Sequence, residues 1–355
     1  MIGPVSNPAY SDAIELFEQT IDGYRRFHIL KAAIDLELFS WLMEFGPASP
    51  YHIADSMGLN ERYVGPFLQA LVDDGFLDQC GTKLALTEAA ARLFAPGSPV
   101  RPPQLLARLS GPSSNWGRLQ ALMQSRGEQI HGSDDDSHNE PIYPGDYYHA
   151  ERAVRDWPQF AAARRLLDLG GTQGALSIAL CKALPSLQAT ILAVPGELES
   201  VRRQVADAGL AVQIEVIEGD LFSTEPGDNY DIVLAVHCLY AFPKRILVAM
   251  ETIAASLRQH GLLVTQHWFE EGQEPQMQNC VRELDRGIRR LRRPLRHPEA
   301  FAERVTSAGF RWLPEPNLHS HKDGVQLRLA QRCDDCSSTA DAGCAVATVG
   351  EVILR

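Results

Sequence analysis

The sequence predicts an α/β fold in which a doubly wound parallel sheet follows an all-helical N-terminal domain. Two observations support this prediction. Beyond residue 164, short apolar runs alternate with amphipathic helical segments, the pattern of a parallel sheet covered by helices on both faces. Before it, apolar residues recur at helical spacing. A chain of 355 residues is also long enough for two domains.

The first elements of the chain are predicted to be helical. Ser11 or Asp12 is suited to cap a helix that begins there. Residues 48–77 read as two helices that turn at Gly58, the second ending near Gly75, and "LDQCGTKLALT" reads as a small β-wing, so the unit resembles a winged helix. The helical spacing before this unit is carried by a series of apolar residues: Ile14, Phe17, Ile21, Tyr24, Phe27 and Ile34.

Winged helices often bind DNA, but the charges here favour another role. The net charge is −12, and Arg62 is the only Lys or Arg between Tyr51 and Gln79, a stretch that holds five acids. A recognition helix needs cations to neutralise phosphates. We therefore favour a helical scaffold that packs against another subunit, and we expect no nucleic-acid partner.

The cellular location is predicted from two features that were sought in the sequence, a membrane-spanning run and a signal peptide. No apolar run is long enough to cross a bilayer, and the first residues lack the features of a signal peptide. Cys80, Cys181, Cys238 and Cys280 are scattered, which suits reduced core cysteines. We expect a cytoplasmic protein with no membrane partner.

Composition divides the chain into four parts. Residues 1–100 form the helical winged-helix domain, 101–150 a linker helix with a flexible loop, 151–332 the sheet domain, and 333–355 a tail that contains cysteines. The linker helix is expected at about Trp116–Arg126. A polar run from His131 to His138 could be drawn as a metal cluster, but a solvated loop is favoured, and no metal is expected.

The stretch "LLDLGGTQGALSIAL", residues 166–180, has the form of a strand, a glycine-rich turn and a helix. Further strands are expected in "QATILAVP", "VQIEVIEGDLF", "YDIVLAVHCLY", "HGLLVTQHWFE" and "GVQLRLAQR". In such sheets, ligands bind at the carboxyl ends of the strands where the strand order reverses.

The order of these motifs resembles a class I S-adenosylmethionine-dependent methyltransferase. It is similar to the small-molecule O-methyltransferases with an N-terminal winged-helix dimerisation domain, and the likeness spans about residues 11–332. The resemblance implies a Rossmann-like sheet, S-adenosyl-L-methionine as cofactor, a small-molecule substrate, and a homodimer formed through the N-terminal helices.

The resemblance assigns cofactor-binding roles to five residues and meets departures at two positions. Thr172 replaces the middle glycine of the turn, and Ala193 replaces the acid that would bind the ribose hydroxyls. Glu197 or Glu199 could bind the ribose hydroxyls in place of the missing acid. Alternatively, both are acids at a helix N-terminus that the helix dipole stabilises. We expect cofactor binding to be weak or absent. The matching residues are Asp168, Gly170, Gly174, Asp220 and Leu221.

The catalytic base is the third departure. Tyr240 stands where many relatives have a histidine, and a tyrosine is a poor base at neutral pH. His237 and His267 each end a predicted strand, and we hold them as equal candidates. Methyl transfer can also proceed by positioning alone if the nucleophile is already activated.

Arginines recur at helical spacing between residues 282 and 296. They form either a solvated helix face or a site for an anionic acceptor, in which Arg286 and Arg289 would bind the substrate. In the tail, Cys333, Cys336 and Cys344 give one CxxC and a single further cysteine, a weak zinc signal. A disordered tail is the simpler interpretation, and an appended peptide substrate is another.

Two functions remain open at this point. The first is an S-adenosylmethionine-dependent methyltransferase that acts on a small molecule, an anionic one if the arginines bind it. The second is a methyltransferase-like protein that no longer methylates and instead catalyses another reaction, binds another ligand or serves as a partner protein. Thr172, Ala193 and Tyr240 favour the second, whereas Asp168 and Asp220 favour the first.

Overall fold

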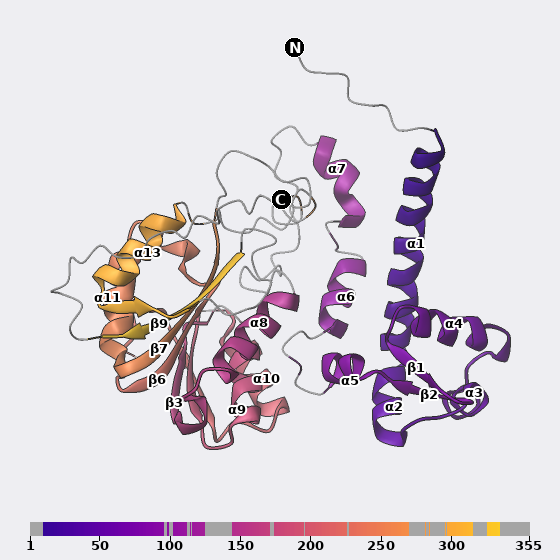
Figure 1. The fold of residues 1–355 in the computed structure, drawn as a ribbon, viewed down its shortest axis with the longest axis horizontal. Coiled ribbons are helices and arrows are strands. Elements are labelled where there is room, and N and C mark those ends of the chain that lie inside the picture. The colour runs from indigo at the N-terminus through magenta and orange to yellow at the C-terminus, as the bar shows by residue number, and fades with distance from the viewer. Residues whose placement is uncertain are drawn as a thin grey trace, which may run out of the picture.

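The computed structural model describes residues 10–95, 98, 102–111, 114, 116–124, 144–170, 174–194, 196–225, 227–269, 281, 284, 295, 297–314 and 325–333. An N-terminal helical domain lies to one side of a C-terminal sheet domain, and α6 and α7 lie between them (Figure 1). This is the predicted combination of a helical domain and an α/β domain.

The N-terminal domain consists of helices and one small hairpin. A left-handed residue, Glu37 with φ 57°, separates the first two helices. The first helix begins at Tyr10, so Ser11 and Asp12 lie within its first turn and not at the predicted cap position. The elements are α1 (Tyr10–Asp35), α2 (Leu38–Phe45), α3 (Pro50–Met57), α4 (Glu61–Asp73), β1 (Leu77–Cys80), β2 (Lys83–Leu86) and α5 (Glu88–Phe94).

The segment between the domains is more helical than its composition indicated. The predicted helix near Trp116 is present as η1 (Trp116–Arg118) and α7 (Leu119–Gln124). An unpredicted helix, α6 (Pro102–Ser110), lies beside α1. Its two leading prolines suggested a linker, but proline is well tolerated in the first turn of a helix, where its missing N–H would have no partner.

In the described part of the chain, the sheet has seven strands in the order β5-β4-β3-β6-β7-β9-β8. The first five of these strands run parallel, and β9 joins β7 antiparallel. Among the strands of the described residues, the short edge strand β8 is the one that the sequence did not predict. The strands are β3 (Arg165–Asp168), β4 (Gln188–Ala193), β5 (Ile214–Glu218), β6 (Tyr230–Val236), β7 (Leu257–Trp268), β8 (Phe310–Trp312) and β9 (Val325–Arg332).

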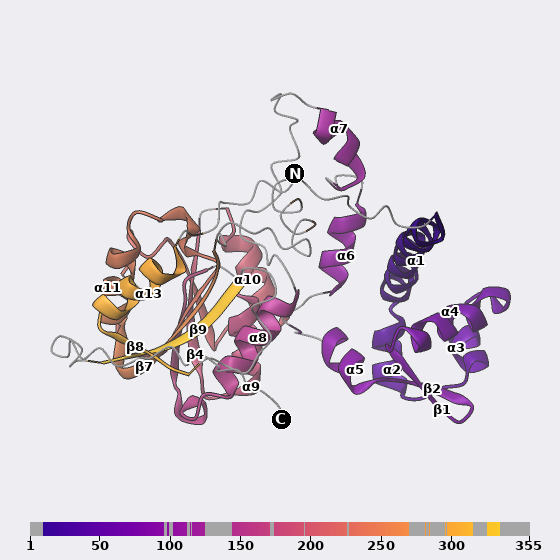
Figure 2. The same ribbon diagram turned by 45° about the horizontal axis from the view of Figure 1, so that its top comes forward.

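Helices cover both faces of the sheet (Figure 2). One face packs against α8 (Pro144–Arg155), α9 (Ala175–Ala183) and α10 (Leu198–Asp207) around buried residues such as Leu166. The other packs against α11 (Ile246–Ser256) and α13 (Pro298–Ser307) around residues such as Val233. Because both faces are covered, the central strand β6 is buried at every position.

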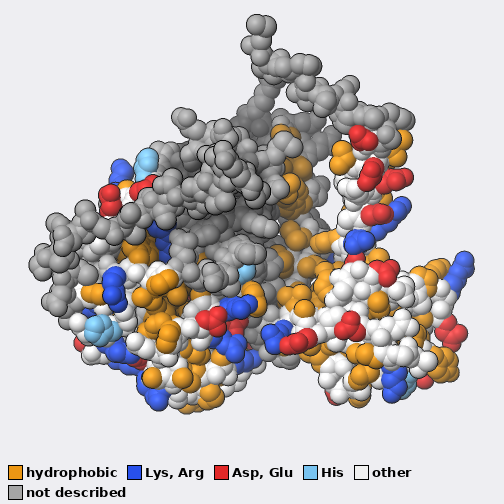
Figure 3. Space-filling view, viewed as in Figure 1, with side chains coloured by type: hydrophobic (Ala, Val, Ile, Leu, Met, Phe, Trp, Pro, Cys, Tyr) orange, Lys and Arg blue, Asp and Glu red, His pale blue; other side chains and the backbone are white. Residues whose placement is uncertain are grey.

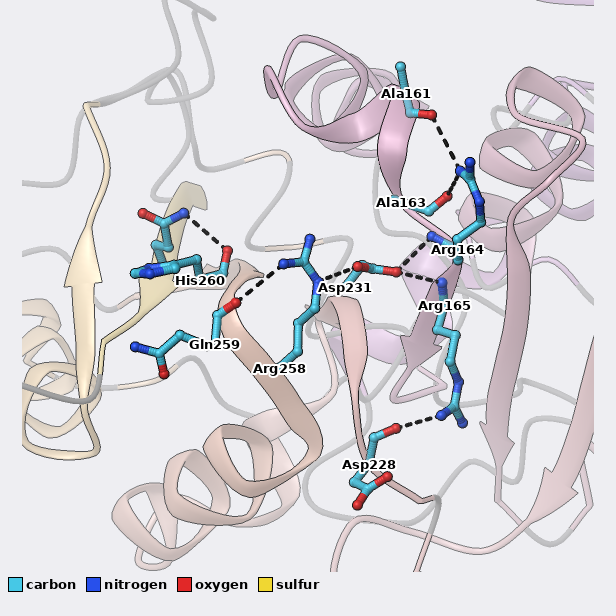
Figure 4. Close-up of polar contacts among 10 residues, drawn as sticks. Ala161, Ala163, Arg164, Arg165, Asp228, Asp231, Arg258, Gln259 and His260 are labelled. Atoms are coloured by element: carbon cyan, nitrogen blue, oxygen red, sulfur yellow. Dashed lines mark hydrogen bonds and ion pairs between the residues drawn. The ribbon is translucent and has the colours of Figure 1, made fainter.

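A buried carboxylate ties the sheet together at the end remote from the carboxyl ends of β3 and β6 (Figure 4). Asp231 accepts hydrogen bonds from the backbone amides of Arg164, at 2.6 Å, and Arg165, at 2.8 Å. The Arg258 guanidinium also donates to it. These contacts join the starts of β3, β6 and β7, so they fix the register of the strands that carry the site.

None of the described helices is long and apolar enough to cross a membrane. Cys181 is a buried free thiol, and burial raises its pKa to about 12. Cys80 is exposed, so the expectation of a core position is wrong for that residue. It lies on the β1–β2 hairpin, where the strand packs only one face against the helices.

Candidate functional site

The candidate site lies where the strand order reverses. From β3 the chain moves through β4 to β5 on one side, and β6 then returns to the other side of β3. The connections after β3 and β6 therefore lead to opposite sides from adjacent strand ends, which is the position of ligands in open parallel sheets.

Asp168 organises the start of the glycine turn. It is 1% exposed, accepts from the Gly170 amide at 3.0 Å with Oδ1, and accepts from the Ser177 hydroxyl at 2.7 Å with Oδ2. Gly170 has φ +87°, and a Cβ there would lie 2.0 Å from the Leu192 carbonyl oxygen. No other residue type fits at this position, and the turn is held against β4.

Gly174 ends the turn and begins α9. Its φ is +78°, and an added Cβ would lie 3.0 Å from Ile191 Cδ1 and 3.3 Å from Val201 Cγ1. The first turn of α9 therefore packs closely against β4 and α10. Thr172, the departure from the glycine pattern, falls outside the described residues.

The loop after β5 presents the second predicted contact. Asp220 uses Oδ1 to accept the backbone amides of Phe222, at 2.7 Å, and Ser223, at 2.9 Å, while Leu221 is buried. Phe222 meets Phe242 edge-on, and the Arg245 guanidinium lies 3.7 Å from the Phe222 ring centroid. Phe222, Phe242 and Arg245 were not predicted as site residues. Their contacts join the loop after β5 to the segment after β6, and no local motif shows such a contact.

The position of the expected ribose-binding acid holds a small apolar side chain. Ala193 ends β4 and is 1% exposed. Of the two acids considered as substitutes, Glu197 is 9% exposed, whereas the Glu199 side chain is 80% exposed and pairs with Arg202. The structure therefore separates two residues that the sequence left equivalent.

The loop after β6 brings together two of the three predicted catalytic residues. His237 has φ +52°, and its backbone amide donates to Gln266 O at 2.8 Å. Its Nδ1 lies 2.7 Å from the Tyr240 hydroxyl, which also accepts the Trp268 amide at 2.6 Å. A histidine held in the left-handed region is strained, a feature that concentrates at functional sites.

His267 joins the same cluster but is placed differently. Its ring centroid lies 5.4 Å from that of Tyr240 and 6.4 Å from that of His237. It is 1% exposed, and its Nε2 accepts the Leu239 amide at 3.3 Å. Burial, and then the charge of His237, hold the pKa of His267 well below its ordinary value. The ring is therefore neutral, with its proton on Nδ1.

Cys238 connects the His237 loop to the glycine turn. Burial, and then the negative charge of Asp168, raise the pKa of its thiol. The Leu169 amide donates to the Leu234 carbonyl oxygen at 3.1 Å, which places the end of β6 beside the end of β3. The predicted cofactor residues and the predicted catalytic residues therefore meet at one edge of the sheet.

Some predicted positions fall outside the described residues. These are Arg286 and Arg289 with the rest of the arginine series, the polar run 131–138, and the tail after Cys333. Among the described residues, no group of three or more His, Cys, Asp or Glu side chains is placed to hold a metal ion.

Two family models match the chain. One, described as an O-methyltransferase domain, matches residues 146–311, and the other, an O-methyltransferase dimerisation domain, matches residues 18–96. Together they cover about two thirds of the sequence. The match to the first domain contains Asp168, Asp220, His237, Tyr240 and His267.

Curated relatives and solved structures agree with these matches. A mitomycin biosynthesis 6-O-methyltransferase from Streptomyces lavendulae is 25% identical over 281 residues, which cover 74% of this chain and 80% of that protein. A 3-hydroxy-5-methyl-1-naphthoate 3-O-methyltransferase from Streptomyces sahachiroi is 26% identical, with 60% of this chain and 64% of that protein covered.

Among solved structures, human N-acetylserotonin methyltransferase in complex with S-adenosylmethionine superposes with a TM-score of 0.57 at 18% identity. The superposition covers 92% of this chain and 99% of that one. It extends over both domains and shows that they share the fold of that protein.

Proposed function

The chain belongs to the family of S-adenosylmethionine-dependent O-methyltransferases, and we propose that it methylates a hydroxyl group of a small, anionic molecule. The observation that carries the proposal is the meeting of the glycine turn, the Asp220 loop and the His237 loop at the reversal of the strand order. The family match extends over both domains, and it favours methyl transfer over a protein that has lost this activity.

The described residues fit the family's cofactor in two places. Gly170 and Gly174 have positive φ and allow the turn to pack closely against β4 and α10 at the carboxyl end of β3, the edge at which ligands of such sheets bind. Asp220 commits Oδ1 to its own loop, which orients the carboxylate and leaves Oδ2 to accept an amino group of adenine beside Leu221. Asp168 holds the turn through Gly170 and Ser177.

When bound, S-adenosylmethionine supplies a methyl carbon on a sulfonium sulfur, which an oxygen nucleophile can attack. We assign His237 as the base that removes the acceptor's hydroxyl proton. With Nδ1 protonated and donating to the Tyr240 hydroxyl, the lone pair lies on Nε2. Tyr240 is thus a positioning residue that selects the tautomer of His237, itself held by the Trp268 amide.

His267 suits a different role from His237. Its Nε2 lone pair is committed to the Leu239 amide, and its ring is fully buried. A lone pair that accepts a backbone amide is not available to remove a proton from a substrate. We therefore infer that His267 fixes the turn at residues 237–241 that carries His237 and Tyr240.

We infer that the acceptor is anionic from Arg286 and Arg289 and from the substrate named for one relative. The relative from Streptomyces sahachiroi is named for a substrate that carries both a hydroxyl and a carboxylate. Arg286 and Arg289 would bind such a carboxylate through paired hydrogen bonds. Replacing either with alanine should raise the KM for the acceptor without changing the affinity for the cofactor.

The test is transfer of a radiolabelled methyl group from S-adenosylmethionine to hydroxylated aromatic acids, with 3-hydroxy-1-naphthoate as the first probe. His237→Gln should lower kcat by about 100-fold, the usual size of a general-base contribution, with little change in KM. His260→Asn, at an exposed left-handed position remote from the site, is the control. A His237→Gln enzyme with wild-type kcat would refute the assignment of the base.

The remaining inferences concern assembly and location. The N-terminal part is a dimerisation domain, and we infer that it forms a homodimer through its helices. The α3–α4 pair followed by the β1–β2 hairpin supports the winged-helix interpretation. We place the protein in the cytoplasm, with no nucleic-acid or membrane partner.

A further inference from the structure

Buried polar atoms without partners form a row on one face of the strands β7, β9 and β8. Each of these side-chain atoms is shielded from solvent and has no hydrogen-bond partner among the described residues. Buried polar atoms are nearly always paired in folded proteins, so a group of unpaired ones in one region indicates a site that a ligand completes. The atoms are His267 Nδ1, Gln326 Oε1, Arg328 Nε and Trp312 Nε1.

The pairing of the strands places these four side chains next to one another. Gln326 is the register partner of His267, and Arg328 is the register partner of Thr265. Directly paired side chains of antiparallel strands have Cβ atoms about 4.5–5.5 Å apart, and diagonal neighbours are within reach of long side chains. Trp312 on β8 continues the row, since the Arg328 guanidinium carbon lies 5.5 Å from the centroid of its ring.

The row begins at the catalytic cluster and leads away from it. His267 is 1% exposed, and its ring contacts those of Tyr240 and of Phe301 on α13, with centroids 5.4 Å and 5.8 Å away. Gln326, Arg328 and Trp312 are partly exposed. The row therefore extends from the buried histidine toward the outer edge of the sheet, where β8 is the last strand.

The row is rich in hydrogen-bond donors and carries a positive charge. His267 Nδ1 bears the proton, because Nε2 accepts the Leu239 amide, and Arg328 Nε and Trp312 Nε1 are donors in every state. The Gln326 amide can donate or accept, depending on which way it is turned.

The charge of Arg328 is not balanced by a neighbouring acid. Among the described residues, its guanidinium contacts the Trp312 ring and pairs with no carboxylate. A guanidinium in the company of other donors is suited to an anionic oxygen ligand. A carboxylate has about four acceptor sites on two oxygens, so it can satisfy several of these donors at once.

We propose that this row binds a carboxylate of the methyl acceptor, with Arg328 as the cation and Trp312, Gln326 and His267 as its neighbouring hydrogen-bonding groups. The inference rests on the proposed function and deepens it, because it places the acceptor's anionic group on described residues of the sheet. These residues are specificity-determining, and the transfer of the methyl group takes place at the other end of the acceptor.

The position of Arg328 sets the kind of acceptor that can use it. The ring centroids of His237 and His267 are 6.4 Å apart, and His267 and Arg328 are diagonal neighbours, about 7–8 Å apart at Cα. An acceptor that extends from His237 to Arg328 therefore has its hydroxyl and its carboxylate at opposite ends. The compound 6-hydroxy-2-naphthoate has this arrangement, and 2-naphthol is the same molecule without the carboxylate.

The experiment measures by calorimetry how the full chain, saturated with S-adenosylhomocysteine, binds each of these two compounds. The wild type should bind 6-hydroxy-2-naphthoate about tenfold to 100-fold more tightly than 2-naphthol, the range for charge-assisted hydrogen bonds. Arg328→Gln should lose most of this preference and keep its affinity for 2-naphthol. Arg304→Gln, at an exposed arginine on α13, is the matched control and should bind both compounds as the wild type does.

A second variant tests the row without changing its charge. Trp312→Phe keeps an aromatic ring beside Arg328 but removes the Nε1 donor. Its affinity for 6-hydroxy-2-naphthoate should fall about threefold to tenfold, with that for 2-naphthol unchanged. Thermal unfolding of each variant checks that it is folded. If the two side chains only supported the sheet, replacing them would weaken the binding of both compounds alike.

The outcomes separate this inference from the proposed function. If the wild type binds S-adenosylhomocysteine but prefers neither compound, or if Arg328→Gln keeps the full preference for the carboxylate, the row does not bind the acceptor and the methyltransferase assignment stands. If the wild type does not bind S-adenosylhomocysteine, the proposed function fails and the inference fails with it.

Discussion

At the scale of single residues, His267 makes the stability of the folded protein depend on pH. Its pKa is held well below the ordinary value by burial and by His237, so the folded protein keeps it neutral. The unfolded chain protonates it below about pH 6.5. Because the unfolded state then binds more protons, the contribution of His267 to stability is complete above that pH and is lost as the pH falls below it.

We expect His267→Gln to flatten the dependence of the unfolding free energy on pH between about pH 6.5 and 5. Urea unfolding at a series of pH values measures this slope. His260→Asn is the control, since His260 is exposed. An unchanged slope in the His267→Gln variant would show that the ring is accessible to protons in the folded state.

Two buried glutamines on neighbouring strands should respond oppositely to the same substitution. Gln266 is 0% exposed, and neither amide atom has a hydrogen-bond partner among the described residues. Gln331 donates to the His260 carbonyl oxygen at 3.0 Å and accepts from Arg311. An unsatisfied buried amide costs about 1–3 kcal/mol, whereas a satisfied one stabilises the fold.

Gln266→Leu should therefore leave the melting temperature unchanged or raise it, and Gln331→Leu should lower it. Thermal unfolding of both variants beside the wild type tests the pair. A large fall for Gln266→Leu would mean that the amide has a partner, such as a buried water, and that the site needs it.

At the scale of the elements, the Asp231 contacts fix the strands that carry the site. Burial alone would raise the pKa of Asp231, but the Arg164 and Arg165 amides and the Arg258 guanidinium outweigh it and lower the pKa. A depressed carboxyl pKa stabilises the fold above the unfolded value, near pH 4, and this contribution is lost as the pH falls further.

Asp231→Ala should destabilise the sheet domain by about 1–3 kcal/mol, because two backbone amides lose their acceptor. The loss should be largest at neutral pH and shrink below about pH 4, where the wild-type carboxyl is protonated. Chemical unfolding at neutral and acid pH measures both effects, with exposed Glu215→Ala as control. Equal stability of Asp231→Ala and the wild type at neutral pH would contradict this role.

The strands of the sheet were predictable because buried parallel strands read as continuous apolar runs, as β6 does. The helix α8 was not predicted, since Pro144 and Gly145 open it and its composition is that of a loop. Asp168 and Asp220 were predicted from their local motifs. The burial of Glu197 but not of Glu199, and the contacts of Tyr240 with His237 and Trp268, depend on tertiary packing that no local pattern encodes.

At the scale of the whole molecule, α1 carries large apolar side chains that the single chain leaves exposed. Leu16, Phe17 and Tyr24 are 59%, 66% and 67% exposed on this helix. Figure 3 shows hydrophobic side chains beside acidic ones along the described part of α1. Such a surface in a dimerisation domain is suited to a partner subunit.

The wild type should be a dimer at micromolar concentration, and Phe17→Glu with Tyr24→Glu should shift it toward monomer, because each charge would be buried at the interface. Light scattering measures the mass. Val212→Glu is the control, since Val212 is 99% exposed and lies outside α1. A wild-type monomer would contradict the assembly.

The central claim is that the cofactor binds at the carboxyl ends of β3 and β5, and calorimetry with S-adenosylhomocysteine on Asp220→Asn tests it most directly. The asparagine oxygen can still accept the Phe222 and Ser223 amides, so the loop is kept, but the negative charge that would accept the adenine amino group is lost. We expect one ligand per wild-type chain and at least about tenfold weaker binding by the variant, with exposed Asp207→Asn unaffected. Wild-type affinity in Asp220→Asn, or no binding by the wild type, would contradict the account.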